Sequence, residues 1–390
     1  MNKQSQRKML NLSLQYLSLK QIFSNSPYTM GSFSNKYIRV ELHYIYSSFC
    51  FKPFVDLRQI DGINIKESLF SNYLSSTIIV DAKCANLKLY TSVQSFGSGS
   101  VVDCYFINIT NSGAGGAFLF NNMGLKLFVT GCHFINTRTT GSFTTSSRSN
   151  AAGGGFCSVS LASHFSRLCF SYCSATKAGG AFFSQVPNGA YQFLNDSTVF
   201  SCSTSIHNGW SSDWGYIMNI QVNATYMYCS DGNSCGYRET SDGVLTKYCH
   251  FAHCTAKQTS YGIIGDYSQS SAVQCTMEYI NFISNTADKS IISLSSASSI
   301  TTIIRHSTFI GNVAPSMVIY VNVKPQFINC WGQSAFSTAQ GSYSNCNFIN
   351  QNSPHPFFFN YCTCKREENT SPFMKTWKYT AVVFSLFIVS

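Results

Sequence analysis

An imperfect repeat runs through the middle of this chain and limits what the chain can fold into. Its clearest copy extends from Cys104 to Phe118 and contains Phe-Ile-Asn, a polar turn, and Gly-Gly-Ala before an apolar run. That order predicts a strand, a turn and a second strand in each copy. Repetition at this length predicts a solenoid, in which each coil buries its apolar side chains against the neighbouring coils.

Further copies share a Phe that is followed two or three positions later by Asn or another small residue. The repeat Phe residues are Phe106, Phe134, Phe170, Phe200, Phe251, Phe282, Phe309, Phe327 and Phe348. Most intervals between them have the length of one coil of a parallel β-helix. The widest interval, 51 residues after Phe200, leaves room for a second, degenerate coil around residues 226–229.

The glycines of the two best copies recur at one distance from the repeat Phe. Gly115 and Gly179 each begin a Gly-Gly-Ala segment nine residues after Phe106 and Phe170, respectively. Glycine tolerates positive φ and close backbone approach, so these segments are predicted to be sharp turns. Coils stack about 4.8 Å apart. One inward Phe per coil therefore predicts a column of stacked rings, and one Asn per coil, with Asn108 as an inward member, predicts a hydrogen-bonded ladder.

We therefore predict an all-β parallel β-helix, with a β-sandwich or a propeller as the alternative. The predicted regions are an N-terminal cap with irregular first coils at 1–100, repeats at 101–355, a polar linker at 356–376 and an apolar tail at 377–390. Alternating apolar residues predict strands at 38–42 and 77–81. The same alternation at 10–14 favours a strand or cap segment over the uninterrupted apolar run of a signal peptide.

The charge distribution argues against a nucleic-acid partner. The net charge is +10, but residues 71–350 carry thirteen Lys and Arg against ten Asp and Glu. Proteins that bind nucleic acid concentrate basic charge on one surface of the folded body. A nearly neutral repeat region does not fit that requirement.

The C-terminal tail from Trp377 to Ser390 is almost wholly apolar and follows Lys375. A membrane-spanning helix needs about 20 apolar residues, which is more than this tail contains. Trp377 and the neighbouring lysines suit a membrane interface. We expect membrane association through this tail, and a buried C-terminal capping strand is the alternative.

The chain contains seventeen cysteines. Four of them lie two residues before a repeat Phe and would point the same way in stacked coils: Cys104, Cys132, Cys249 and Cys346. A buried column of small thiols is the favoured interpretation, because free Cys is commonly buried. Disulfides between stacked neighbours are the alternative, since adjacent coils approach the Cα separation that a disulfide needs.

The segment from Cys249 to Cys254, Cys-His-Phe-Ala-His-Cys, contains four residue types that bind zinc. On a strand, Cys249 and His253 would face one way, and His250 and Cys254 the other. Four ligands would then not converge, so we predict no metal site here. The sequence also carries no nucleotide or phosphate motif, and we expect no cofactor.

The candidate ligand-binding residues lie in the wide interval after Phe200. They are Trp210, Asp213, Trp214 and Tyr216. Closely spaced Trp, Asp and Tyr on a long loop of a rigid scaffold could stack on sugar rings. The alternative, which we favour, is that the two tryptophans pack back onto the solenoid.

The repeat resembles those of two families of surface proteins. Gly115-Gly116-Ala117 and Gly179-Gly180-Ala181 look like the glycine signature of chlamydial polymorphic membrane proteins, and Phe282-Ile283-Ser284-Asn285 matches their second signature. The Cys-, Asn- and Phe-rich form is similar to related surface proteins of trichomonad parasites. The resemblance covers residues 100–350. It implies a right-handed β-helix at a cell surface with adhesin or interaction roles, and no catalytic residues.

We therefore expect a non-enzymatic cell-surface or secreted protein that mediates adhesion to a host-cell glycan or surface protein. The alternative is a polysaccharide-processing β-helix enzyme of the pectate lyase or glycosidase type. Such enzymes work with clustered carboxylates or with calcium-assisted chemistry. The ten acidic residues of 71–350 occur singly in the sequence, so convergence of two or three of them in the fold would favour the enzyme.

Overall fold

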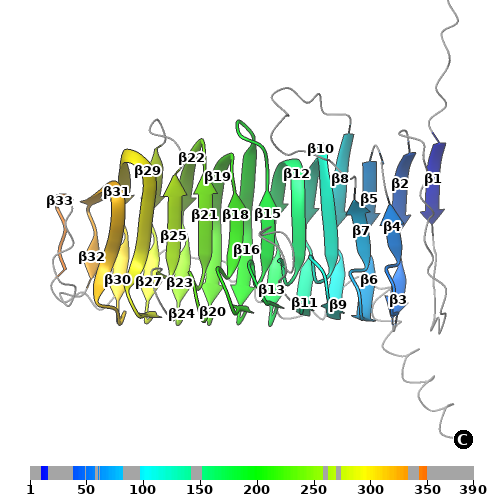
Figure 1. The fold of residues 1–390 in the computed structure, drawn as a ribbon, viewed down its shortest axis with the longest axis horizontal. Coiled ribbons are helices and arrows are strands. Elements are labelled where there is room, and N and C mark those ends of the chain that lie inside the picture. The colour runs from blue at the N-terminus through cyan, green and yellow to red at the C-terminus, as the bar shows by residue number, and fades with distance from the viewer. Residues whose placement is uncertain are drawn as a thin grey trace, which may run out of the picture.

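The computed structural model describes residues 10–15, 38–48, 50–57, 60, 62–81, 97–141, 152–257, 262–268, 274–332 and 342–348. These residues contain no helix. Their 33 strands pair in parallel into one long sheet that winds through stacked coils (Figure 1). The chain is therefore an all-β solenoid, as the repeat predicts.

Each coil contributes strands to three faces, which we call faces I, II and III. Face I contains β1 Leu10–Gln15, β2 Ile38–His43, β5 Gly62–Lys66, β8 Gly97–Val102, β22 Gly243–Lys247, β26 Cys275–Glu278 and β33 Ser342–Ser344. Face II contains β3 Tyr46–Ser48, β6 Leu69–Tyr73, β9 Tyr105–Asn111, β11 His133–Thr139, β13 Cys169–Ser171, β23 His250–Ala252, β27 Asn281–Ile283, β30 Thr308–Ile310 and β32 Trp331–Gly332. Short strands follow it, namely β14 Ser174–Ala175, β17 Ser203–Thr204, β20 Tyr228–Cys229, β24 Thr255–Ala256 and β28 Thr286–Ala287.

Face III contains β4 Val55–Leu57, β7 Ile78–Asp81, β15 Phe182–Gln185, β18 Trp210–Asp213, β21 Gly236–Thr240 and β25 Ile264–Ser268. Four long strands continue from face III onto face I: β10 Phe118–Thr130, β12 Phe156–Ser166, β29 Ser290–Arg305 and β31 Ser316–Ile328. Two continue from face I onto face II: β16 Tyr191–Phe200 and β19 Tyr216–Thr225.

Two residues with positive φ, five positions apart, bound the face II strand of each coil. We call the first turn A and the second turn B. In nine coils the turn A residues are Glu67, Asp103, Gly131, Arg167, Asp196, Gln221, Tyr248, Tyr279 and His306. The matching turn B residues are Asn72, Asn108, Asn136, Tyr172, Ser201, Tyr226, His253, Ser284 and Gly311. Left-handed backbone is uncommon outside glycine, so this recurring pair fixes where each coil changes direction.

The predicted column of stacked Phe rings lies inside face II. Phe106, Phe134 and Phe170 occupy equivalent positions on successive coils, with ring centroids 5.1 Å and 4.8 Å apart. A second run joins Phe251, Phe282 and Phe309, with centroids 5.4 Å and 5.0 Å apart. All six side chains are fully buried.

Two repeat Phe residues were assigned to the wrong position. Val199, and not Phe200, lies opposite Phe170, so Phe200 faces outward and is partly exposed. Phe327 is buried on β31 of face I, opposite Ile304, and does not belong to the face II column. Phe200 is thus one residue away from the column position, and Phe327 lies on face I instead of face II.

The wide interval after Phe200 holds the predicted additional coil. Its position in the Phe column is occupied by Ala224, which lies opposite Val199 and Phe251. Trp210 of β18 is fully buried, stacks on Phe182 with ring centroids 6.5 Å apart, and contacts Phe251 in a tilted arrangement at 6.2 Å. The indole thus occupies the volume that the small side chains of two successive coils leave in the core.

The two Gly-Gly-Ala segments form sharp turns, and the Gly153-Gly154-Gly155 turn of the coil between them stacks on both. Gly115, Gly153 and Gly179 all have positive φ, between 66° and 76°. The backbones of successive turns nearly touch, because a Cβ on Gly116 would lie 1.8 Å from the carbonyl oxygen of Gly154. The prediction that glycine is required here is confirmed.

The predicted asparagine ladder exists, but at two different positions. Asn136 donates to Asn108, and Asn108 donates to Asn72, along the exposed row of turn B residues. The prediction that Asn108 points inward is therefore wrong. The inward ladder comes one residue later, where Asn285 donates to Asn312 at 2.9 Å with both side chains buried.

Regular stacking begins before residue 101. The predicted strands at 10–14, 38–42 and 77–81 correspond to β1, β2 and β7. Phe70 of β6 stacks on Phe106, with ring centroids 5.5 Å apart. The linker and tail predicted at 356–376 and 377–390 lie outside the described residues. Among the residues that the structure does describe, none forms a helix long and apolar enough to cross a membrane.

A buried ion pair interrupts the apolar core. Arg238 of β21 points inward and contacts Asp266 of β25, with Nε and Oδ1 2.5 Å apart; Arg238 also donates to Thr246. Arg238 and Asp266 are 0% and 5% exposed. Burial raises the pKa of Asp266, and the guanidinium beside it opposes that rise.

The Phe column predicts a contrast between two variants. Phe134→Ala should lower the free energy of unfolding by about 3–5 kcal/mol, because it leaves a cavity between stacked rings. Phe200→Ala should cost about 1 kcal/mol or less, because only exposed edge contacts are lost. Urea denaturation followed by circular dichroism measures both, and equal costs would contradict the register.

The ion pair predicts strong coupling between its two members. Arg238→Met should cost roughly 3–5 kcal/mol, because the carboxyl group of Asp266 stays buried without its partner. The double variant Arg238→Met, Asp266→Leu should recover most of that loss. Denaturation of the three chains gives the coupling energy, and additive effects would show that the pair does not act as a unit.

Candidate interaction surface on face I

A row of apolar and aromatic side chains runs along the outside of face I. One residue of each coil occupies the same outward position, and the coils pair in register there. We call this row the outer stripe; its members are Phe128, His164, Phe193, Met218, Leu245, Thr276 and Ile303. The side chains before and after each of them point into the core, because faces alternate along a strand.

The aromatic part of the outer stripe is contiguous. Phe128 is 36% exposed, and its ring centroid lies 6.0 Å from that of His164. The His164 ring lies 4.8 Å from Phe193. Tyr191 and Tyr216 pair opposite each other on the same outward side, two residues before Phe193 and Met218. The stripe is thus widened at its centre by two tyrosines, of which Tyr191 is 42% exposed.

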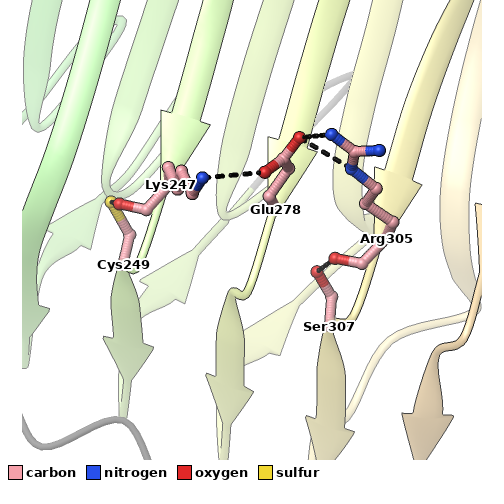
Figure 2. A network of polar contacts seen from close by, with 5 residues as sticks. All are labelled: Lys247, Cys249, Glu278, Arg305 and Ser307. Atoms are coloured by element: carbon pink, nitrogen blue, oxygen red, sulfur yellow. Dashed lines mark hydrogen bonds and ion pairs between the residues drawn. The ribbon is translucent and has the colours of Figure 1, made fainter.

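An ion cluster borders the outer stripe two residues further along three successive strands (Figure 2). Lys247 Nζ lies 3.3 Å from one carboxylate oxygen of Glu278, and Arg305 Nε donates to the other oxygen at 2.6 Å. The Glu278 side chain is 8% exposed, whereas Lys247 and Arg305 are 31% and 47% exposed. Solvent therefore meets the two cations, and this end of the surface is positive.

The pKa of Glu278 reflects two opposed effects. Burial raises the pKa, while the hydrogen bonds and charges of Arg305 and Lys247 lower it, and the net direction is downward. Lys247 also lies over the Tyr248 ring, with Nζ 4.9 Å from its centroid. Cation–π contact and the ion pair together hold the Lys247 side chain along the edge of the sheet.

The residue directly after turn A makes a recurring hydrogen bond, and this bond explains the positions of several cysteines. In Figure 2, the Cys249 thiol donates to the carbonyl of Lys247 at 3.3 Å, and Ser307 donates to that of Arg305 at 3.1 Å. The same bond to the carbonyl two residues earlier is made by Ser68, Cys104, Cys132, Ser197, Cys330 and Cys346. These carbonyls also accept a backbone N–H from the preceding coil, as Arg305 does from Tyr279. Cys and Ser at this position thus add a second hydrogen bond to the carbonyl that precedes the left-handed turn.

The cysteines of turn A are free thiols. Cys104, Cys132 and Cys249 are buried and Cys346 is half-buried, so the favoured prediction of buried thiols holds for three of the four. Cys249 has apolar neighbours at this position on both adjacent coils and therefore does not join a continuous thiol column. Cys169, elsewhere on face II, is the disulfide-bonded cysteine of the described residues.

The four predicted ligand-binding residues do not form one surface. Trp210 lies in the core, as the favoured alternative predicted, and is out of reach of a surface ligand. Asp213, at the end of β18 on the outward side of face III, is only 5% exposed and accepts a hydrogen bond from Ser211. Trp214 lies at the corner with positive φ, and Tyr216 lies beside the outer stripe on face I. Tyr216 is thus the predicted residue that adjoins the candidate surface.

The acidic residues are distributed over several faces. Asp266 and Glu278 are ion-paired, and Asp103 lies 3.9 Å from Arg167. One juxtaposition of acids arises from the fold, because Asp213 pairs in register with Glu239 on the next coil of face III.

No metal-binding group of His, Cys, Asp and Glu exists among the described residues. The face assignment for the segment from Cys249 to Cys254 was partly wrong, because turn B at His253 breaks the alternation. Cys249 and Cys254 are both buried, while His253 is exposed and His250 is partly exposed. The two thiols and the two imidazoles therefore face opposite ways.

The outer stripe was missed in the sequence, because its members are separated by whole coils and become a row only when the register is known.

No family model matches this chain, and no curated protein and no solved structure is significantly similar to it.

The ion cluster predicts a dependence of stability on pH. Because the pKa of Glu278 is lower in the folded chain than in the unfolded chain, its stabilisation is present above the unfolded value of about 4.3 and is lost as pH falls through the folded value. Glu278→Gln should cost about 1 kcal/mol at pH 7 and clearly less at pH 3. Denaturation at both pH values tests this.

The matched control is Glu67→Gln, at an exposed turn A residue on the same row of turns. Its denaturation curves should follow those of the original chain at both pH values. A cost for Glu278→Gln that is equally large at pH 3 would show that packing, and not charge, holds this cluster.

Proposed function

We propose that this chain is a non-enzymatic interaction scaffold, secreted or displayed at a cell surface, that binds a partner through face I. The observation that supports this most directly is the outer stripe. An outward strand position normally carries polar residues, whereas here Phe193, Met218 and Leu245 follow one another on three coils. Their side chains are partly exposed, and a contiguous apolar patch that reaches the surface is typical of protein interaction sites.

The chemistry of face I favours a protein partner over a glycan. The central part of the outer stripe is aliphatic as well as aromatic, and aliphatic side chains bind apolar protein surface. The exposed cations Lys247 and Arg305 border it at one end. We propose a partner surface with an apolar ridge and acidic residues beside it, because complementary charge favours encounter and orientation.

Several finer features belong to the same proposal. We propose right-handed coils, since parallel crossover connections are right-handed in nearly all sheets. Relationship to the chlamydial and trichomonad surface repeats is supported by the Gly-Gly-Ala turns and the Phe column. Membrane association through the tail from Trp377 to Ser390, which lies outside the described residues, would hold the solenoid at the surface.

Polysaccharide processing is the second candidate, and one observation favours it. Asp213 and Glu239 lie opposite each other on adjacent coils, where strands are about 4.8 Å apart. Retaining glycosidases use two carboxyl groups about 5 Å apart. If this function is correct, Asp213→Asn and Glu239→Gln should each abolish release of reducing ends from polysaccharides while leaving face I binding intact.

The interaction proposal predicts loss of binding when the outer stripe is made polar. The triple variant Phe193→Ser, Met218→Ser, Leu245→Ser should reduce binding of the fluorescent chain to cultured animal cells at least about tenfold, because central apolar contacts dominate such interfaces. Ser166→Ala with Asn195→Ala, in the adjacent outward row, is the matched control and should bind normally.

Treatment of the cells distinguishes the class of partner. Trypsin treatment should remove the binding, and periodate oxidation of surface glycans should leave it. Binding that survives trypsin but not periodate would identify a glycan instead. Equal binding by the triple variant and the original chain, with unchanged circular dichroism, would contradict a role for the outer stripe.

A further inference from the structure

Cys330 and Cys346 lie opposite each other on the last two described coils. Trp331 and Asn347 form a parallel bridge, and Asn347 N–H donates to the carbonyl of Cys330 at 2.9 Å. The N–H of Cys330 donates to Cys346 Sγ at 3.5 Å, and the two thiols share a hydrogen bond. Strands of adjacent coils are about 4.8 Å apart, which lies within the range of Cα separations that disulfides span.

Two further cysteine pairs have the same relation between adjacent coils. They are Cys104 with Cys132, and Cys173 with Cys202, and in each pair the thiols are hydrogen-bonded to each other. All four of these side chains are fully buried. The three pairs therefore share one geometry and differ in solvent access, since Cys346 alone among these six is half-buried.

The surroundings of Cys346 also favour its reactive form. Hydrogen bonds from the side chain and backbone of Cys330 lower the pKa of Cys346 to about 6, and the same contact raises the pKa of Cys330. At neutral pH, Cys346 is then a thiolate and Cys330 a thiol. The thiolate is the nucleophile in thiol–disulfide exchange.

We propose that Cys346 and Cys330 form a redox-active dithiol that a low-molecular-weight disulfide, such as glutathione disulfide, oxidises to a disulfide between the last two coils. The Cys346 thiolate attacks one sulfur of the oxidant, forming a mixed disulfide and releasing one thiolate of the oxidant. The Cys330 thiol then gives its proton to the solvent and attacks Cys346 Sγ, which releases the second thiolate. Two protein thiols are oxidised, and one disulfide is reduced to two thiols.

The position of the pair gives this step a structural effect. β33, from Ser342 to Ser344, is exposed along its whole length, and among the described strands it pairs with β31 alone. It is the final strand that the structure describes in the stack. A bond between Cys330 and Cys346 would hold this coil to the preceding one when backbone hydrogen bonds open.

The experiment uses the full chain, folded and reduced, at pH 7.5. A limiting amount of N-ethylmaleimide should alkylate Cys346 at least about tenfold faster than Cys104, Cys132, Cys173 or Cys202. After incubation with glutathione disulfide, mass spectrometry should find a disulfide between Cys330 and Cys346. Digestion includes chymotrypsin, because the sequence places no tryptic site between these two cysteines but does contain Phe336 and Tyr343.

The variant Cys330→Ser keeps a small hydrogen-bond donor and removes the second thiol. With glutathione disulfide it should accumulate a stable glutathione adduct on Cys346, whereas the original chain should carry the adduct only transiently. Cys132→Ser is the matched control and should leave the chemistry of Cys346 unchanged. Alkylation of Cys346 no faster than that of the buried pairs, or a lasting adduct in the original chain, would overturn the proposal.

Discussion

The left-handed residue at turn A, together with the side chain that follows it, is the constraint on which the rest of the solenoid depends. A non-glycine residue in this conformation costs free energy, of the order of 1 kcal/mol. The cost is offset where the next side chain adds a hydrogen bond to the carbonyl just before the turn, as Ser68 and Cys249 do. The same small donor recurs at this position in six of the nine coils, and Leu168, Val222 and Ile280 replace it in the other three. This bond accounts for the positions of five of the seventeen cysteines without invoking disulfides.

The core tolerates different residues in one column because neighbouring faces compensate in volume. Val199 and Ala224 replace Phe in two successive coils of the column, and the Trp210 side chain of face III fills the space beside them. The next coil then has Gly236 opposite Trp210, where a Cβ would lie 2.7 Å from the indole. Large and small residues thus alternate across coils and faces at nearly constant interior volume, which a close-packed core requires.

The sequence contains the Phe column and the glycine turns in readable form, but not the exact register. From the pattern alone, Phe170 can be aligned with Phe200 or with Val199, because a Cys follows shortly after either residue. The structure pairs Phe170 with Val199. The five-residue spacing of turns A and B was invisible, since Asp, Arg, Gln, Tyr and His all occupy turn A. The coil at Phe70 has Ser68 where other copies have Cys and contains no Gly-Gly-Ala segment, and it was therefore placed with irregular structure.

The candidate surface depends on information that no local pattern carries. Phe128, His164 and Phe193 are 36 and 29 residues apart in the chain, yet their rings are in contact along face I. Only the pairing of whole coils brings such residues together. By contrast, the predicted cluster around Trp210 was close in sequence and was divided by the fold among the core, a corner and two faces.

The residues of the outer stripe can change with little effect on the fold, which is seldom true of a contiguous surface in a compact domain. Each of its side chains belongs to a different coil, projects from a strand whose inward neighbours already fix the register, and leaves the turn caps untouched. A substitution at Met218 or Leu245 would therefore alter the contact surface of one coil and leave the rest of that coil unchanged. A lineage could alter the partner of such a protein one coil at a time while inheriting the same interior, so rapid surface divergence and a constant fold are compatible here.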